Sequence, residues 1–394
     1  MIWEKWLDDQ SALRDQAGLR RTLHARGPAD PVVDLAGNDY LGLSRHPAVR
    51  ERAAEAARTW GAGAGASRLV TGTLGLHVEL ETALAGFLGQ PAALVTSTGY
   101  HANLAAVTAL ADRDCLVVSD AHVHASLVDA ARLSRAEVTI TPHNDVCAVS
   151  AALAHKGDRR AMVLAESVYS VLGDPASLLE LAGVCASYDA LLVVDEAHGL
   201  GVAGAGGHGL VRELGLAGLN HVVVTATLSK ALGAQGGVIL GSAVVVDHMV
   251  NRARQFIYDT GLAPAAAAGA LAALELLMTR PELPALVHTR ANALAGALGV
   301  TAPEGGVLSV PMPSPHVALG AQAEALEEGV RVGCFRPPSV PDGVSRLRVT
   351  INAGIPEPDW ARAAAVLGQV VKEHTTTPPD RSLRSRPGGD PVTP

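Results

Sequence analysis

The sequence predicts an α/β protein with a mostly parallel central sheet covered by helices, followed by a smaller C-terminal α+β domain. Short runs of Val, Leu, Ile and Ala are apolar on both faces, which is typical of strands buried in a parallel sheet. Stretches with helical spacing of apolar residues separate several of these runs. A chain of 394 residues is also long enough to form more than one domain.

The elements are expected in the following order along the chain. A helix occupies the first 25 residues, and a short strand follows at 32–35. The strands of the central sheet are expected at 93–96, 115–119, 161–165, 190–195, 221–225 and 237–240. A long helix rich in Ala and Leu covers 264–277. The last domain is expected to contain strands at 306–310, 331–333 and 346–351 and a closing helix at 358–372.

These elements divide the chain into four parts. Residues 1–45 form an N-terminal helix and short strands, 46–265 a large domain, and 266–374 a small C-terminal domain. Residues 375–394 are rich in Pro, Gly and Arg and have no periodicity, so we expect a disordered tail.

Composition excludes several classes of protein. A net charge of −8 with only 3% aromatic residues lacks the basic surface of a nucleic-acid-binding protein. The four cysteines lie far apart, which is typical of reduced thiols in a cytoplasmic protein. The first residues lack an apolar signal segment, and polar residues interrupt the longest uncharged stretch. We therefore expect a cytoplasmic protein with neither nucleic acid nor a membrane as partner.

Polar residues follow two of the predicted strands where helices are expected to begin. Gly99 and Tyr100 come after the 93–96 run, and backbone N–H groups at a helix start favour a phosphate. An ordinary turn between a strand and a helix is the alternative. His124 follows the 115–119 run, where an imidazole could stack on a flat cofactor, act on the substrate or serve only the structure.

Asp195 ends a fully apolar run, and a carboxylate there is costly unless it meets a cation or a donor. It could hold the protonated ring nitrogen of a pyridine cofactor, with His198 near the same group. The segment Asp195-Glu196-Ala197-His198 (DEAH) also resembles a sequence motif of nucleotide-driven helicases. The chain lacks the GxxxxGK[ST] loop that those proteins require. A metal site formed with His122 and His124 stays open as an alternative.

Lys230 lies between an apolar strand and a Gly- and Ala-rich run, without a neighbouring charge. A desolvated lysine has a lowered pKa and is suited to Schiff-base chemistry and proton transfer. A plain surface charge is the alternative. Thr227 could place its hydroxyl on a phosphate oxygen. The ordered set of a glycine turn, a histidine, Asp-x-x-His and Thr-x-x-Lys is typical of fold-type I transferases that depend on pyridoxal 5'-phosphate.

From about Trp3 to Val371 the chain resembles the α-oxoamine synthases of this fold type. The motifs that carry the resemblance lie at 38–43, 67–72, 124–127, 143–145, 195–199, 227–230, 336–341 and 346–350. Segments 67–72 and 336–341 are similar to the corresponding segments in the oxononanoate branch of the family. Glu196 and Ser229 replace residues that are common in relatives, and Ser97-Thr98-Gly99 replaces a usual Ser-Gly pair.

The resemblance implies a pyridoxal-phosphate-dependent acyltransferase that condenses an amino acid with an acyl thioester and releases CO2. In the oxononanoate branch the substrates are L-alanine and pimeloyl-CoA or pimeloyl-acyl-carrier protein. A sister synthase that uses glycine and a short acyl-CoA, like 2-amino-3-ketobutyrate CoA ligase, would share the cofactor residues. A pyridoxal-phosphate-binding regulator is a further alternative, but no basic helix-turn-helix segment precedes residue 30.

The resemblance also implies roles for the four residues expected to be catalytic. Lys230 would bind the cofactor covalently and then act as general base. Asp195 would pair with the pyridinium nitrogen, and His198 would contact the phenolic oxygen. His124 would stack on the ring and border the substrate.

Other positions are implied in cofactor and substrate binding, and no metal is implied. The cofactor phosphate would be bound by Gly99, Tyr100, Thr227, Ser170 and, from the neighbouring subunit of a homodimer with shared active sites, Thr260. Arg348 would hold the amino-acid carboxylate in a bidentate fork, with Asn38 nearby. Arg20 and Thr350 would meet the acyl thioester.

Overall fold

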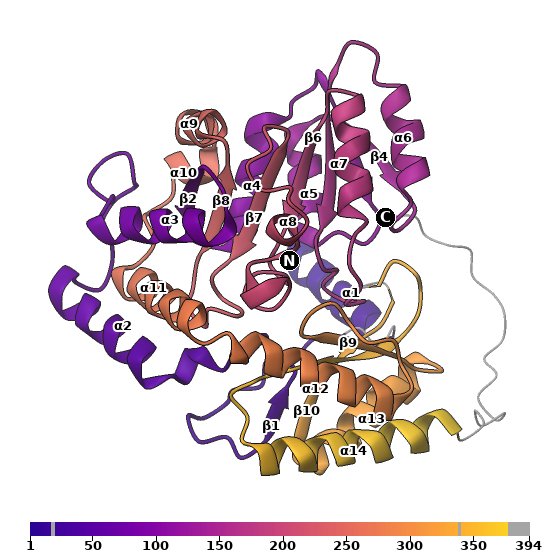
Figure 1. Ribbon diagram of the computed structural model, residues 1–394. Coiled ribbons are helices and arrows are strands. Elements are labelled where there is room, and N and C mark those ends of the chain that lie inside the picture. The colour runs from indigo at the N-terminus through magenta and orange to yellow at the C-terminus, as the bar shows by residue number, and fades with distance from the viewer. Residues whose placement is uncertain (17–19, 338–339, 377–394) are drawn as a thin grey trace. The chain divides into compact units, whose positions relative to one another are not determined.

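The computed structural model describes residues 1–16, 20–337 and 340–376 (Figure 1). The first 32 residues form one compact unit, and the chain from Val33 onward forms another. In the first unit, helix α1 spans Ile2–Gln16. The helix predicted through residue 25 is therefore too long, because 20–31 is not helical and Leu19 lies outside the described ranges. Gly27 and Pro28 are helix-breaking residues in that stretch.

The second unit contains a sheet of seven strands. In sheet order these are β2 (Ala92–Thr96), β8 (Gly237–Gly241), β7 (Val222–Thr227), β6 (Leu191–Asp195), β5 (Arg160–Glu166), β3 (Cys115–Asp120) and β4 (Glu137–Thr141). Strand β8 runs antiparallel to both of its neighbours, and the remaining pairs are parallel. Every strand predicted for this sheet is present, and β4 is an additional edge strand.

Successive residues of the central strands enter two separate cores, because side chains alternate across a sheet. Val117 and Val193 pack with one set of helices, and Val118 and Val194 pack with the other. The first set comprises α4 (Gly99–Leu110), α5 (Ala125–Ser134), α9 (Ala243–Arg252) and α10 (Arg254–Ile257), and the second α3 (Gly75–Leu88), α6 (Val146–Ala154) and α7 (Leu178–Ser187). Each fully buried Val or Leu contributes about 1.5–3 kcal/mol. The sheet is thus covered on both faces, as predicted.

Two further helices pack against each other beside this sheet (Figure 1). Helix α2 (Pro47–Trp60) begins with a proline after His46, whose ring accepts a hydrogen bond from the Ala48 amide. Helix α11 (Pro264–Thr279) also begins with a proline and agrees with the Ala- and Leu-rich helix expected from the sequence. The short helix α8 spans Leu210–Glu213.

A smaller sheet contains strands from both ends of the second unit. Its order is β1 (Val33–Leu35), β10 (Val330–Phe335), β11 (Arg346–Thr350) and β9 (Val307–Pro311), with β1 parallel to β10 and the other pairs antiparallel. Helices α12 (Glu282–Leu298), α13 (Pro315–Glu327) and α14 (Glu357–Thr376) belong to this part of the chain. The division at 45 and 265 stays a prediction.

The predicted tail begins slightly too early, because residues 375 and 376 complete α14. The rest of that segment, 377–394, lies outside the described residues. Within ranges 1–16, 20–337 and 340–376, each helix is too short or too polar to cross a membrane.

Candidate active site

A cavity of about 250 Å3 lies where β2, β3, β6 and β7 end and α4 begins. Ligands of open α/β sheets bind at these carboxyl ends. The lining residues are Thr98, Gly99, Tyr100, Asn103, His124, Ser126, Glu166, Asp195, Ala197, His198, Thr227, Ser229 and Lys230. All four residues predicted to be catalytic are among them, although they come from segments up to about a hundred positions apart.

Lys230 follows β7 and faces the cavity with its amine. Its Nζ lies 2.7 Å from Nε2 of His198. Loss of solvent lowers the pKa of Lys230 to about 8, although the nearby Asp195 carboxylate acts in the opposite direction. This amine therefore loses its proton far more readily than an ordinary lysine, and the uncharged amine is the form needed in a nucleophile or a base.

His198 bridges Lys230 and Tyr40. Its Nδ1 lies 2.6 Å from the Tyr40 hydroxyl, which also lies 3.2 Å from Oδ1 of Asn38. Burial, followed by the positive charge of Lys230, holds the pKa of His198 well below its ordinary value, so the imidazole is neutral. Burial also raises the pKa of Tyr40 to about 12, so the phenol keeps its proton.

Asp195 is fixed by donors on both carboxylate oxygens. Oδ2 accepts from the Asn103 side-chain amide at 2.7 Å, and Oδ1 accepts from the Ala197 backbone at 2.8 Å. Asn103 is itself held by the Thr225 hydroxyl at 2.5 Å and donates to Ser126 Oγ at 2.8 Å. A carboxylate with this support keeps its orientation and can pair with a protonated ring nitrogen in the cavity.

The start of α4 provides a place for an anion. Thr98 caps the helix, since its Oγ1 accepts from the His101 amide at 3.0 Å. The N–H groups of Gly99 and Tyr100, in the first turn, have no partner within the helix. A Cβ atom on Gly99 would lie only 2.8 Å from Cβ of Thr227, so only glycine fits without displacement. A phosphate suits this end of the cavity because the helix dipole favours negative charge.

His124 lines the cavity and caps α5. Its Nδ1 is 2.7 Å from Ser126 Oγ, and this contact fixes the ring at the edge of the cavity. The placement fits an imidazole that stacks on a flat group.

Glu166 is a site residue that the sequence analysis missed. It ends β5, faces Asp195 in the strand register and lines the cavity. Burial, and then the charge of Asp195, raises the pKa of Glu166 to about 8, so the carboxyl is largely protonated at neutral pH. The signal that identified Asp195, a carboxylate at the end of an apolar strand, also applies to Glu166. Tyr40 carried a weaker signal, since only the 38–43 motif pointed to it, and Asn103 lies in none of the motifs.

Arg348 lies on β11 beside the cavity rather than in its lining. Its Nη1 is 3.1 Å from Asn38 Oδ1, and its Nε donates to the Ser170 carbonyl at 2.6 Å. The positive charge of Arg348 contributes to the lowered pKa of Lys230 and of His198. The structure thus brings Arg348 and Asn38 together, as predicted, and adds the Ser170 backbone.

Besides Arg348, Asn38 and Ser170, which meet beside the cavity, three predicted residues are absent from its lining. Thr350 is buried, with 1% of its surface exposed, and Thr260 is exposed and pairs with Ser67. Arg20 belongs to the first unit, where Nη2 donates to Asp15 at 2.6 Å. The functions assigned to these three residues stay predictions.

The metal alternative is not supported by the geometry. His122 packs against His143, with ring centroids 4.4 Å apart, and does not line the cavity. Among the residues for which the structure gives positions, no group of three or more His, Cys, Asp or Glu side chains could hold a metal ion.

Comparison with known proteins places this site in a family. The sequence model of the family described as aminotransferase class I and II matches residues 30–367 of this chain. The chain is 55% identical over 367 residues to the 8-amino-7-oxononanoate synthase of Mycolicibacterium gilvum (strain PYR-GCK), covering 93% of this chain and 97% of that protein. The chain belongs to the 8-amino-7-oxononanoate synthases of the aminotransferase class I and II family. A relative from Mycolicibacterium smegmatis is 54% identical, with coverage of 93% and 96%.

Solved structures agree with the fold of this family. Serine palmitoyltransferase from S. paucimobilis, with a bound PLP–myriocin aldimine, has a TM-score of 0.86 and 28% identity, covering 93% of this chain and 97% of that one. An 8-amino-7-oxononanoate synthase from Francisella tularensis has a TM-score of 0.73 at 24% identity, covering 87% and 98%, which supports the fold. The predicted fold type I and the predicted α-oxoamine synthase family, acyltransferases that depend on pyridoxal phosphate, are confirmed.

The cavity can be tested against pyridoxal phosphate by its donor set. An amine, a supported carboxylate, a neutral imidazole and a helix start fitted only by glycine line one small space. They match the aldehyde, pyridinium nitrogen, phenolic oxygen and phosphate of that cofactor. The residues present therefore fit the group.

Proposed function

We propose that this protein condenses L-alanine with a pimeloyl thioester to give 8-amino-7-oxononanoate, CO2 and the free thiol, a step of biotin biosynthesis. The observation that carries the proposal is the cavity in which Lys230, Asp195 and His198 meet beside Arg348. The high identity to curated 8-amino-7-oxononanoate synthases supports this substrate pair over glycine with a short acyl-CoA.

Five residues are proposed to hold pyridoxal phosphate. Lys230 would bind it covalently through Nζ, and Asp195 would pair with its ring nitrogen. His198 would donate to or accept from the phenolic oxygen, while Gly99 and Thr227 would bind the phosphate. When bound, the cofactor supplies an electron sink for a carbanion at Cα of the amino acid.

Lys230 is proposed to move the proton on which the reaction depends. Its amine, with a pKa lowered to about 8, can take the Cα proton of L-alanine at Nζ and later return a proton to the product. His198 lies 2.7 Å from that nitrogen and orients it without competing for the proton, because its own pKa is held low. Asp195 would pair with the protonated ring nitrogen and so favour the electron sink.

Arg348 is proposed to bind the substrate carboxylate. Its guanidinium is aimed by the Ser170 carbonyl and Asn38, and a planar guanidinium binds a carboxylate through two parallel hydrogen bonds. Loss of that carboxylate as CO2 follows after the Cα–C bond to the acyl group has formed and the thiol has left.

The acyl thioester and the quaternary structure complete the proposal. Arg20 and Thr350 are the residues expected to contact the thioester, whose carrier is coenzyme A or an acyl-carrier protein. We propose a cytoplasmic homodimer with shared active sites. The exposure of Thr260 supports its proposed contact with the phosphate of the neighbouring subunit.

Mass spectrometry of the reaction product tests the proposal. Purified protein with pyridoxal phosphate is supplied with L-alanine and pimeloyl-CoA, with L-alanine and pimeloyl-acyl-carrier protein, or with glycine and acetyl-CoA. Accumulation of 8-amino-7-oxononanoate in either of the first two reactions is the expected result. Product only in the third would overturn the substrate assignment, and no product in any reaction would overturn the proposed activity.

A further inference from the structure

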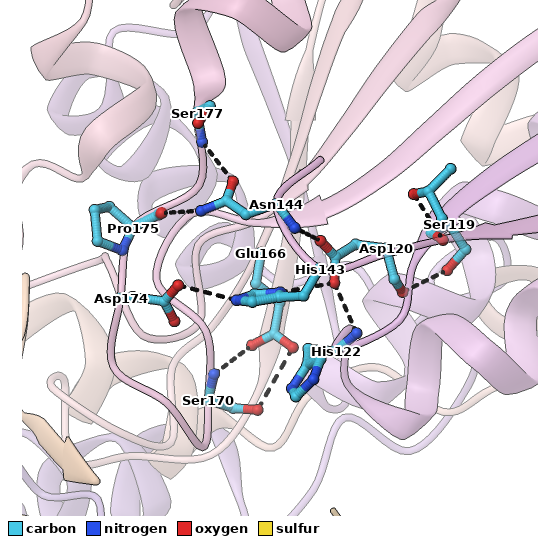
Figure 2. A network of polar contacts seen from close by, with 11 residues as sticks. Ser119, Asp120, His122, His143, Asn144, Glu166, Ser170, Asp174, Pro175 and Ser177 are labelled. Atoms are coloured by element: carbon cyan, nitrogen blue, oxygen red, sulfur yellow. Dashed lines mark hydrogen bonds and ion pairs between the residues drawn. The ribbon is translucent and has the colours of Figure 1, made fainter. Parts of the chain in front are cut away.

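A second group of polar residues lies next to the cavity, between the ends of β3, β4 and β5 (Figure 2). We call Asp120, His143, Asn144 and Asp174 the His143 clamp. Nδ1 of His143 lies 3.0 Å from Asp120 Oδ1, and its Nε2 lies 2.9 Å from Asp174 Oδ2. Asp120 ends β3, whereas Asp174 belongs to the loop 167–177 after β5. The imidazole therefore joins the sheet to that loop.

The geometry of the clamp requires a charged imidazole. An ionised carboxylate only accepts hydrogen bonds, so a ring that meets a carboxylate at each nitrogen must donate from both. The groups that face the ring besides the two aspartates are His122 and Tyr169, with centroids 4.4 and 4.3 Å away. Burial opposes the charge, but the hydrogen bonds that His143 donates to Asp120 and Asp174 outweigh burial and raise the pKa of His143 to about 9.

Asn144 ties the same loop at two further points. Its Nδ2 donates to the Pro175 carbonyl at 2.9 Å, and its Oδ1 accepts from the Ser177 amide at 3.0 Å. Its own amide donates to Asp120 Oδ2 at 2.6 Å. Asn144 has a positive φ of 56°, a conformation that asparagine tolerates better than most residues. The backbone conformation of Asn144 thus places its side chain in contact with the loop 167–177.

The loop in turn carries the group that aims Arg348. Ser170 accepts from Arg348 Nε through its carbonyl at 2.6 Å, and its amide donates to Glu166 at 2.9 Å. Figure 2 shows Ser170 and Glu166 beside the clamp. The loop also packs closely on β9, since a Cβ on Gly173 would lie 2.1 Å from the Val307 carbonyl oxygen. A shift of the loop therefore moves the acceptor of the Arg348 guanidinium.

From these contacts we infer that His143 is a positioning residue for substrate recognition. It holds the loop 167–177 against Asp120, and through the Ser170 carbonyl it sets the orientation in which Arg348 meets the carboxylate of the amino acid. This inference rests on the proposed function, because it takes Arg348 as the carboxylate-binding group. It assigns the His-Asn pair of the 143–145 motif to the amino-acid substrate rather than to the cofactor.

The test is a titration of the holoenzyme with L-alanine, followed by the change in the visible absorbance of the bound cofactor. His143→Gln removes the charge and keeps a polar side chain, and it should raise the dissociation constant of L-alanine about tenfold, the equivalent of about 1.4 kcal/mol. The affinity for pyridoxal phosphate and the KM for the pimeloyl thioester should change less than about twofold. Asp174→Asn removes the charge at the loop end and should act in the same direction. If the His143→Gln protein does not fold, Asp174→Asn serves as the test variant in its place.

A matched control is His374→Gln. His374 also pairs with a carboxylate, Glu324 at 2.8 Å, and its side chain is 23% exposed compared with 22% for His143. It lies on α14, outside the clamp, and its replacement should leave alanine binding unchanged. If both variants weaken alanine binding equally, or if His143→Gln weakens all ligands equally, the inference is overturned.

Arg348→Lys separates this inference from the proposed function. If Arg348→Lys weakens alanine binding but neither clamp variant does, the inference fails and the proposed function stands. If Arg348→Lys leaves alanine binding unchanged, or the spectrum does not respond to L-alanine at all, the proposed function fails and the inference with it. When both single variants act, His143→Gln combined with Arg348→Lys should be less than additive, since the two residues act on one contact.

Discussion

Two histidines of this molecule have both ring nitrogens engaged and yet carry different charges. His198 lies between the Lys230 amine and the Tyr40 hydroxyl, and its pKa is held well below the ordinary value. His143 lies between two carboxylates, and its pKa is raised to about 9. The histidine in the cavity is thus neutral, and the histidine in the clamp is a cation.

The difference shows that the partners, rather than burial alone, decide the charge of a histidine. Burial disfavours the imidazolium at both positions. At His198 the nearby positive charges act in the same direction, whereas at His143 the two aspartates reverse it. A neutral ring can share hydrogen bonds with a reacting amine, and a cation can hold two acidic segments together.

Replacing Lys230 removes the amine next to the neutral histidine. Lys230→Ala should lower kcat/KM at least about a thousandfold, because the general base is lost together with the covalent link to the cofactor. The visible absorbance of protein-bound pyridoxal phosphate should disappear as well. Steady-state kinetics and absorption spectra check both effects. Lys156→Ala, in which the lost amine contacts only backbone carbonyls, is the control and should behave as the native protein does. Turnover by Lys230→Ala would contradict the proposed base.

Replacing His198 tests whether its neutral ring matters. His198→Gln should lower kcat/KM about a hundredfold while the cofactor stays bound, since the contacts to Lys230 and to the phenolic oxygen are lost but the covalent link through Lys230 remains. Tyr40→Phe keeps the packing and removes the hydroxyl 2.6 Å from Nδ1, so its effect should be smaller, about tenfold. A His198→Gln enzyme with native kinetics would indicate that the contact to Lys230 has no catalytic role.

The pH dependence of cofactor incorporation tests the charge of Lys230. Only the uncharged amine attacks the aldehyde, so the rate at which the apoenzyme takes up pyridoxal phosphate should rise roughly tenfold per pH unit up to a pKa of about 8, and then level off. Stopped-flow absorbance measures this rate. A rate that continues to rise above pH 10 would show that the pKa of Lys230 is not lowered.

The smallest effect concerns the stability contributed by the clamp. The pKa of His143 is raised from an ordinary 6.5 to about 9, so its stabilisation is complete below pH 6.5 and is lost as the pH rises through 9. His143→Gln should therefore lower the free energy of unfolding by about 1–3 kcal/mol at pH 6, and by less at pH 10. Denaturant unfolding at both values provides the measurement. A difference that grows with pH would contradict a charged His143.

Most of the fold could be predicted from the sequence, because the central strands are apolar on both faces and short. Strand β4 was missed, since residues of Glu137–Thr141 are largely exposed at the sheet edge and lack the continuous apolar run. Helix α1 was extended too far, because apolar residues continue at approximate helical spacing to Leu23, whereas the helix spans Ile2–Gln16. The small sheet could not be derived, since β1 and β10 pair across about three hundred residues.

Site residues were predictable where a charged residue ends or closely follows an apolar strand. Lys230 and Asp195 gave that signal, and Glu166 gave the same signal but was overlooked. Tyr40 and Asn103 could not be assigned, because their contacts with His198 and Asp195 join positions 158 and 92 residues apart. Such contacts depend on the strand order, which local patterns do not determine.

The pairing of β1 with β10 has a consequence for biosynthesis on the ribosome. All strands of the large sheet, including those that end in Asp195 and Thr227, lie before residue 242, whereas β10 and β11 leave the exit tunnel later. Domains generally fold as their residues emerge. The wall that holds the cofactor can thus form on a nascent chain, while Arg348 arrives last. The newly made polypeptide would acquire its binding site for the cofactor before the residue that binds the amino-acid carboxylate.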